Sequence, residues 1–252
     1  MKYILKISTI LIFLIIIKSC DKPNELKTSV SVKGLETQGE FIESIKEEIQ
    51  SKYKCKAKLS GAIKFKTSTS LNTLTIKIDS IGIDSLVPNI IASEVSLTIF
   101  DKILNSKFKD IFKNLDIQVN KDGNWSLDYE LNSNKYSQIK NQIQAGETFL
   151  KNWKKDNFKA NDYLFHNIYP IDTLMQTLED TIANIKLRNG KITKQKFIAY
   201  YIRPGTLEGK DLDFVYVVFQ LDFEKKKDFL RLIFPLKEME SKPKIIGTEG
   251  VI

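Results

Sequence analysis

The C-terminal part of the chain contains four strand-like stretches that follow one another with only short polar turns between them. These stretches are Gln195–Arg203, Leu212–Phe223, Asp228–Lys237 and Lys244–Ile252. Strands joined by such short links must run antiparallel, because a parallel pair needs a crossover of a dozen or more residues. The sequence therefore predicts an antiparallel, four-stranded sheet in this region.

The second of these stretches, Leu212–Phe223, is apolar at nearly every position rather than at alternate positions. Successive side chains of a strand point to opposite faces, so a strand of this kind is covered on both sides. We expect one face of the sheet to lie against helices. The other face is expected to lie against the first half of the protein or a partner.

Three helical segments are predicted before these strands. Apolar residues recur at helical spacing at about Asn134–Lys155 and at Leu174–Ile182, and a short segment around Ala160–His166 is expected between these two helices. Pro170 separates the last two segments, and Asn189-Gly190 closes the third. Residues 134–252 therefore predict three helices followed by a curved four-stranded sheet, which is a domain of the α+β class.

The first half of the chain changes between the two periodicities in the order α-β-β-α-β-β. Thr37 and Glu40 have the spacing of a capping box, which predicts where the first helix begins, and Pro88 suits the first turn of the second helix. Asp122-Gly123 predicts a hairpin between the last two strands. The expected strands are Ala62–Thr67, Leu74–Ile78, Leu115–Val119 and Leu127–Leu131. This order predicts a compact α+β domain at residues 35–133.

The second half resembles the nuclear-transport-factor-2-like superfamily, and most of all its envelope members of unknown function. The resemblance rests on a helix with the sequence AGETFLKNW (Ala145–Trp153), on the strand DFVYVVFQLDF (Asp213–Phe223) and on the ending KIIGTEG (Lys244–Gly250). It implies a cone-shaped α+β fold in which a curved sheet wraps over helices. Such a fold can hold a ligand in its concavity.

If a pocket exists in this cone, polar-tipped residues on the strands and one tryptophan on the first helix are expected to orient the ligand. They are Trp153, Tyr200, Tyr201, Arg203, Tyr216 and Gln220. The alternative is that the protein's own side chains fill the cone.

The chain begins with a segment typical of a secretory signal. Two lysines precede the nearly continuous apolar run Ile7–Ile17, which is shorter than the roughly 20 residues that span a membrane. The run ends in Ile17-Lys18-Ser19-Cys20, which resembles the cleavage site of bacterial lipoproteins, although Lys18 stands where that pattern has a small or apolar residue. The resemblance implies that residues 1–19 are removed and that the sulfur of Cys20 carries fatty acyl chains.

Lipoprotein processing is our interpretation of this segment. A retained signal anchor, in which Lys18 stops transfer, and ordinary secretion are the alternatives. Lipidation predicts a protein held in the bacterial cell envelope, facing the periplasm or the cell surface, because several acyl chains anchor far more firmly than one. Residues 20–34 contain few apolar side chains and are expected to form a tether.

The charge of the chain does not indicate a nucleic-acid partner. The formal charge is +8, and removal of the three lysines in residues 1–19 leaves +5. Lysines are interspersed with acids along most of the chain, and the sequence has no arginine-rich arm or basic-aromatic motif. We therefore interpret the lysines as a solvated surface, with attraction to anionic lipid as the alternative.

Few residues in the sequence suit catalysis or metal binding. His166 is the one histidine and is expected to cap or pack at a helix end, while Cys55 is left as a single, structural thiol once Cys20 is lipidated. The usual zinc motifs are absent from the sequence, and no metal or cofactor is expected. Gly205–Asp211 (GTLEGKD) resembles a phosphate-binding loop, but it is one residue short and links two strands, so a hairpin loop is expected.

These observations predict a membrane-anchored envelope lipoprotein that serves binding or assembly rather than catalysis. Its partners would be the membrane, through the N-terminal lipid, and a protein or a small apolar ligand. One alternative is a small-ligand carrier or an enzyme that uses an apolar pocket in the C-terminal cone. A further alternative is a structural subunit of a larger envelope complex that uses the sheet of the first domain. Enzymes of the resembled superfamily use a general base buried in the cone, whereas Asp213 and Asp222 lie at strand ends.

Overall fold

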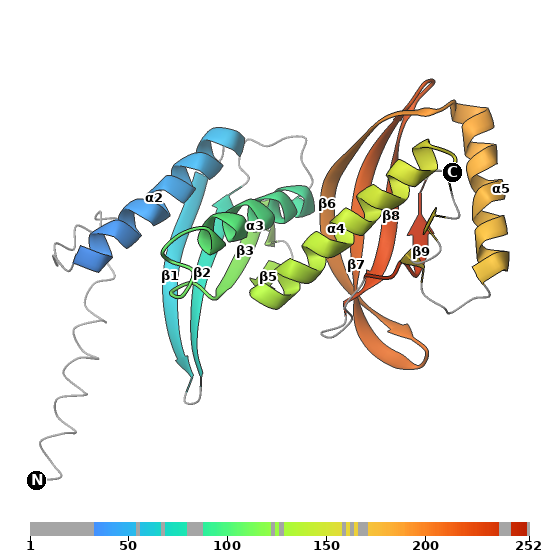
Figure 1. Cartoon of the computed structure of the whole chain (residues 1–252). Helices are drawn as coiled ribbons and strands as arrows, with labels where there is room; N and C mark the ends of the chain where they lie inside the picture. Colours follow the sequence, from blue (N-terminus) through green and yellow to red (C-terminus); the bar gives the residue numbers. More distant parts are fainter. Residues whose placement is uncertain are drawn as a thin grey trace, which may run out of the picture. The chain divides into compact units, whose positions relative to one another are not determined.

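The computed structural model describes residues 33–53, 56–66, 69–79, 88–121, 124–125, 129–157, 160–161, 164–165, 171–236 and 243–250. Within these residues the structure has four α-helices and nine strands, and the strands form two separate sheets (Figure 1). The fold is therefore of the α+β class, as predicted. Contacts between residues divide the chain into two units, Met1–Glu40 and Phe41–Ile252. The described part of the first unit is the start of one helix.

The first sheet is mixed. Its strands are β1 (Lys56–Lys66), β2 (Thr69–Asp79), β3 (Asn114–Lys121), β4 (Asn124–Trp125) and β5 (Tyr129–Asn132). The strands β1 and β2 form an antiparallel hairpin, and β3 runs parallel to β2 but antiparallel to β4 and β5. The hairpin predicted between the last two strands is confirmed, and Lys121 pairs with Asn124 across Asp122-Gly123, which lies outside the described residues. The parallel pair was not predicted.

Two helices belong to this half of the chain, α2 (Lys33–Tyr53) and α3 (Pro88–Leu104). Helix α2 begins at Lys33, so the predicted start at the Thr37 capping box is wrong. The residues between Lys33 and Thr37 include no proline, which would have kept them out of the helix. Pro88 is the first residue of α3, as predicted. The apolar face of α3 is buried at Ile91, Val95, Ile99 and Ile103, whereas Leu104, the last residue of the helix, is exposed.

The second half of the chain begins with two long helices, α4 (Ser133–Lys154) and α5 (Ile171–Asn189). The side chain of Asn132 caps α4 by accepting a hydrogen bond from the Lys135 N–H at 2.9 Å. Helix α5 ends at Gly190, whose φ of +81° suits glycine. Between the two helices the structure describes only residues 155–157, 160–161 and 164–165, so the described residues do not show the predicted middle helix as a full helix.

The second sheet is an antiparallel meander, as predicted. Its strands are β6 (Ile192–Leu207), β7 (Lys210–Phe223), β8 (Lys227–Pro235) and β9 (Gly247–Glu249), in that spatial order. The hairpin between β6 and β7 turns at Glu208-Gly209, where φ is positive at both residues (51° and 75°), as a type I′ turn requires. The segment predicted to be a hairpin loop rather than a phosphate loop therefore lies in a hairpin.

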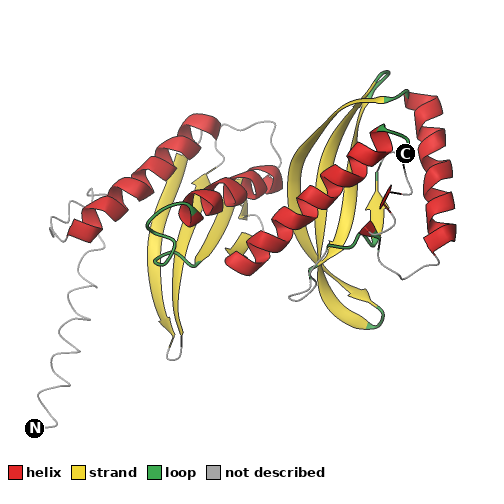
Figure 2. Cartoon of the chain, viewed as in Figure 1, coloured by secondary structure: helices red, strands yellow, loops and turns green. Residues whose placement is uncertain are grey.

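Helix α4 lies across one face of this sheet, which we call the inner face (Figure 2). A Cβ atom on Gly146 would come within 2.6 Å of the Phe219 ring and 3.1 Å of Leu232, so the backbone of α4 touches the sheet directly. The inward side chains of β7 are fully buried at Val215, Val217 and Phe219. We call the opposite side of the sheet its outer face.

Buried side chains from both halves of Phe41–Ile252 form one hydrophobic cluster. The two sheets lie on either side of Ser133 in the sequence, where α4 begins, but β6 also contacts α3. The division into domains at residues 133 and 134 stays a prediction, since the sheets are separate while their cores are continuous.

Candidate functional site

Tyr200 is fully buried on the inner face, where β6 meets α3 and β5. Its hydroxyl lies 2.8 Å from Ser96 Oγ, its N–H donates to Ser93 Oγ at 2.8 Å, and its carbonyl accepts from the Tyr129 hydroxyl at 3.2 Å. Burial raises the pKa of Tyr200 and of Tyr129 well above the usual value. Because all three polar groups of Tyr200 have protein partners, this residue joins elements of the fold rather than orienting a ligand.

Trp153 of α4 is also buried on the inner face, with its ring edge-to-face to Phe149 at a centroid distance of 5.9 Å. A cavity beside it has a volume of about 20 Å³, which is room for one water molecule. At Trp153 and at Tyr200 the inner face is therefore packed with protein side chains.

Arg203 and Tyr216 lie on the outer face of the same sheet. The Tyr216 ring stacks on Tyr201, with ring centroids 4.8 Å apart and ring planes 9° from parallel. The central guanidinium carbon of Arg203 lies 4.9 Å from the Tyr201 ring centroid and 5.8 Å from that of Tyr216. We call Tyr201, Arg203 and Tyr216 the outer-face cluster. The residues predicted to share one pocket are thus divided between two faces.

A β-bulge determines which tyrosine faces which side. Tyr201 and Tyr216 are directly opposite each other in the β6–β7 register, and this register shifts between Phe197 and Ala199. A one-residue shift exchanges the two faces of a strand. Alternation along the sequence places Tyr200 and Tyr201 on opposite faces, but it could not show which of the two lies on the side of α4.

The outer-face cluster carries a positive charge. Arg231 of β8 and Glu249 of β9 are register partners and form an ion pair at 3.6 Å. Among the described residues, Arg203 has no hydrogen-bond or ion-pair partner, and its contacts are the two tyrosine rings. Burial raises the pKa of Tyr201, and the charges of Arg231 and Arg203 oppose this rise. Within the outer-face cluster, Arg203 is therefore the cation that can bind a ligand.

Gln220 and Phe229 extend the outer face along β7 and β8, where they are register partners. The Gln220 Nε2 donates to Asp222 Oδ1 at 2.8 Å. The Phe229 side chain is 50% exposed, although it is a large apolar residue. Sequence analysis missed Phe229 and Arg231, and the available signal was their alternation with the buried Leu230 and Leu232.

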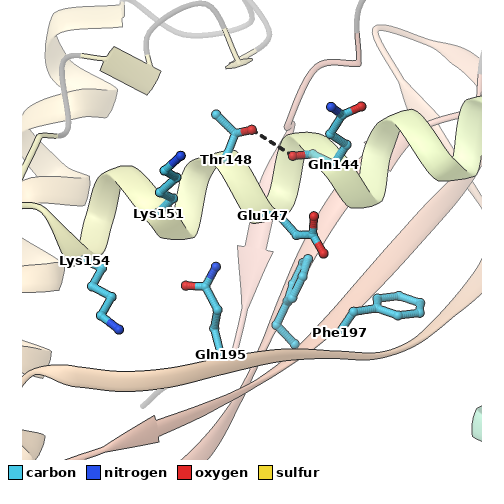
Figure 3. A pocket seen from close by; sticks show the side chains of 8 residues that line it. Gln144, Glu147, Thr148, Lys151, Lys154, Gln195 and Phe197 are labelled. Carbon is cyan, nitrogen blue, oxygen red and sulfur yellow. Dashed lines mark hydrogen bonds between the residues drawn. The ribbon is translucent and has the colours of Figure 1, made fainter.

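A second candidate site is an open groove of about 500 Å³ between α4 and the inner face (Figure 3). It is lined by Gln144, Glu147, Thr148, Lys151 and Lys154 of α4 and by Gln195, Phe197 and Phe219 of the sheet. In Figure 3, Lys154 and Phe197 lie toward opposite ends of the groove, and Gln195 lies between them. Sequence analysis missed this groove because it predicted an apolar pocket, whereas most of these side chains are polar.

Several polar groups of the groove already have partners. Lys154 Nζ donates to the Thr193 carbonyl at 2.8 Å, and Thr148 Oγ1 donates to the Gln144 carbonyl at 2.9 Å. The buried Oε1 of Gln195, by contrast, has no hydrogen-bond partner within the described part of the chain. The groove can therefore offer an acceptor from Gln195 and a cation from Lys151 to a ligand that also has an apolar part.

Some of the expected features lie beyond the structure's described ranges. Within those ranges, no group of three or more histidine, cysteine or acidic side chains could hold a metal ion. Among the same residues, every helix is too short or too polar to cross a bilayer. Cys20, Cys55 and His166 lie outside the described residues, so what the sequence predicts for them stays a prediction.

No known protein family matches the chain, and no curated protein is significantly similar to it. Among solved structures, that of Bd1075 from Bdellovibrio bacteriovorus is similar over 73% of this chain, with 13% sequence identity and a TM-score of 0.31. The chain spans 62% of the length of that protein. A similarity this weak supports no conclusion about fold or function.

Proposed function

We propose that this protein is a bacterial envelope lipoprotein, anchored through Cys20, whose unit Phe41–Ile252 is a non-enzymatic binding or assembly module. The anchor is supported by the sequence, in which a basic start, a short apolar run and the ending Ile17–Cys20 follow the lipoprotein signal. Acyl chains on Cys20 would hold the tether, which was predicted at residues 20–34 and would end where α2 begins at Lys33, and the folded unit at the membrane, facing the periplasm or the cell surface.

The outer-face cluster is the observation that carries the binding role. The inner face of the β6–β9 sheet is buried in the core except beside the groove, whereas the outer face presents stacked Tyr201 and Tyr216, the exposed Arg203 and the half-exposed Phe229. Tyrosine and arginine are among the residue types that supply most of the binding energy at protein interfaces. This arrangement supports recognition at a surface rather than a reaction in a cavity.

The cone-like fold of residues 134–252 is part of the proposal. Helices followed by a four-stranded antiparallel meander is the element order of the nuclear-transport-factor-2-like superfamily, and it supports placing this half among those folds. Trp153 and Tyr200 are packed within the inner face, which favours a module that binds through its surface over an enzyme that works inside the cone.

A small-ligand carrier is the second candidate, because the groove between α4 and the inner face has a volume within the usual range of ligand sites. Its ligand would place an apolar part against Phe197 and a polar part near Lys151 and Gln195. This candidate would be favoured over the first if native mass spectrometry of the purified protein shows a bound small molecule that Phe197→Ala loses and Arg203→Ala retains.

Metabolic labelling with a fatty-acid analogue tests the anchor. We expect the native chain to be labelled and to fractionate with membranes, and Cys20→Ala to lose the label because the acylated sulfur is gone. Cys55→Ala is the matched control and should keep the label. Label retained by Cys20→Ala, or an unlabelled native chain that begins at Met1 and remains in the soluble fraction, would contradict the proposal.

A further inference from the structure

We infer that the outer-face cluster is the anchor point for a protein partner and receives a carboxylate from an acidic segment of that partner. The inference rests on the binding role proposed above and names the kind of partner and the contact that it makes.

The first argument is the way Arg203 is held. Its guanidinium lies over two tyrosine rings, at 4.9 and 5.8 Å from their centroids, and the ring faces attract the cation. A guanidinium that contacts rings with its planar face keeps its N–H groups at the rim. Because Arg203 is restrained before any partner arrives, binding costs less side-chain entropy than it would for a free arginine.

The second argument is charge complementarity. Arg231 is paired with Glu249, so the three charged groups near the stack carry a net charge of +1, which belongs to Arg203. A single carboxylate balances this charge and matches the fork of N–H donors of the guanidinium. A phosphate group carries up to two negative charges, and the Glu249 carboxylate nearby would repel it more strongly.

The third argument is the shape of the surface, which favours a protein over a small molecule. The described cavities are lined by other residues, while Arg203 and Phe229 lie exposed on the outer face of the sheet. Small molecules bind in concave sites. A protein partner brings its own surface to cover an exposed one, and arginine and tyrosine are typical anchors of such contacts.

Photo-crosslinking in the native cells tests the inference on the full chain. The variant Phe229→p-benzoylphenylalanine places the reactive group on the outer face, and Leu187→p-benzoylphenylalanine is the matched control, because Leu187 is 77% exposed on α5. We expect one protein to be crosslinked from Phe229 but not from Leu187. Mass spectrometry of the crosslinked peptide should show a segment that contains aspartate or glutamate.

Charge exchange then tests the contact itself. Adding Arg203→Glu to the Phe229 variant should lower the crosslink yield at least about tenfold, because a carboxylate would face a carboxylate, and Arg203→Lys should have a smaller effect because the charge remains. Arg188→Glu on α5 is the control and should leave the yield unchanged. Changing the acidic residue of the captured segment to lysine should restore the crosslink to Arg203→Glu.

Three outcomes would overturn the inference. They are a crosslink that persists in Arg203→Glu, a captured segment without an acidic residue, and no protein crosslinked from Phe229, which is also the result expected for a small carboxylic acid. If circular dichroism shows that Arg203→Glu does not fold, the inference is tested by the crosslink yield of Arg203→Lys and by the presence of an acidic residue in the captured segment. Fatty-acid labelling tests the Cys20 anchor independently of these crosslinking results. A protein crosslinked from Leu187 alone would overturn this inference, while the proposed binding role would then belong to another surface.

Discussion

At Tyr200 a hydroxyl, an amide and a carbonyl are all bonded to other elements inside the core. Two of its partners, Ser93 and Ser96 of α3, are themselves fully buried. A buried polar group that loses its partner is costly, because water cannot replace the lost bond. The backbone and the side chain of Tyr200 therefore should not contribute equally to stability.

We predict that Ser93→Ala destabilises the protein more than Tyr200→Phe. The serine variant leaves the buried Tyr200 N–H without its acceptor, which costs about 1–3 kcal/mol. Tyr200→Phe removes one hydroxyl at a cost of about 1 kcal/mol, because Ser96 Oγ keeps its bond to the Ser93 carbonyl. Urea unfolding of the purified variants measures both values, and an equal or reversed order would contradict this account.

At the scale of the elements, the approach of α4 to the sheet depends on one glycine. Gly146 faces the Phe219 ring and the Leu232 side chain at distances that leave no room for a methyl group. In an exposed helix, replacing glycine with alanine stabilises by up to about 1 kcal/mol. At Gly146 the overlap with the sheet works against this gain.

We predict that Gly146→Ala destabilises the protein by about 1–3 kcal/mol, because a Cβ atom only 2.6 Å from the Phe219 ring forces the helix and sheet apart. Gly39→Ala in α2 is the matched control, since a Cβ atom there meets nothing within 4 Å, and it should stabilise slightly. Thermal unfolding of the two variants compares them. A stabilising Gly146→Ala would show that α4 does not lie this close to the sheet.

Much of the element order could be predicted, because helical and strand periods differ clearly over long segments such as Ser133–Lys154 and Lys210–Phe223. The start of α2 could not, since Thr37 fits both a helix cap and a helix interior. Nor could the parallel pairing of β2 with β3, because a connecting helix permits either direction of the strand that follows it.

The candidate site was predicted only in part, for a reason that lies in strand geometry. The sequence identified Arg203 and Tyr216, which the structure places beside Tyr201. Alternation along β6 places Tyr200 on the face opposite Arg203. Which of the two faces meets α4 could not be predicted, because the register shift after Phe197 has no signature in the residue types. Local irregularities of a strand depend on its neighbours, and so they become visible only in the assembled sheet.

At the scale of the whole molecule, the two halves of Phe41–Ile252 share one core. Tyr129 and the serines of α3 belong to the first half, and they bond directly to Tyr200 of the second. Elements that share buried contacts unfold together more readily than elements joined only by a linker.

We predict one cooperative unfolding transition for both halves. The chain has two tryptophans, Trp125 in β4 and Trp153 in α4, so Trp125→Phe and Trp153→Phe each leave one fluorescent reporter. Each reporter should show the same urea midpoint as the far-ultraviolet circular dichroism of its own variant. Midpoints that differ within one variant would show that residues 35–133 and 134–252 behave as independent domains.

We also predict that stability falls in strongly alkaline solution. Burial raises the pKa of Tyr129, Tyr136 and Tyr200 above the ordinary value of about 10, and the bond to Asp101 adds to the rise at Tyr136. Folding favours the protonated form, so its contribution is complete below about pH 10 and is lost as the pH rises through the folded-state pKa. Phenolate absorbance recorded with circular dichroism should show a late step that coincides with unfolding. Tyr129→Phe should diminish only that step.

The edge strand β6 of the second sheet bears on how copies of the protein would meet if the proposed anchor held them side by side on a bilayer. A sheet border with unbonded backbone groups invites another polypeptide to extend it. On β6 the backbone of Tyr200 is already bonded to Ser93 and Tyr129, and Lys194 and Lys196 stand exposed nearby. The β6 edge therefore offers few free backbone groups at Tyr200, and pairing of adjacent copies through this edge is expected to be disfavoured.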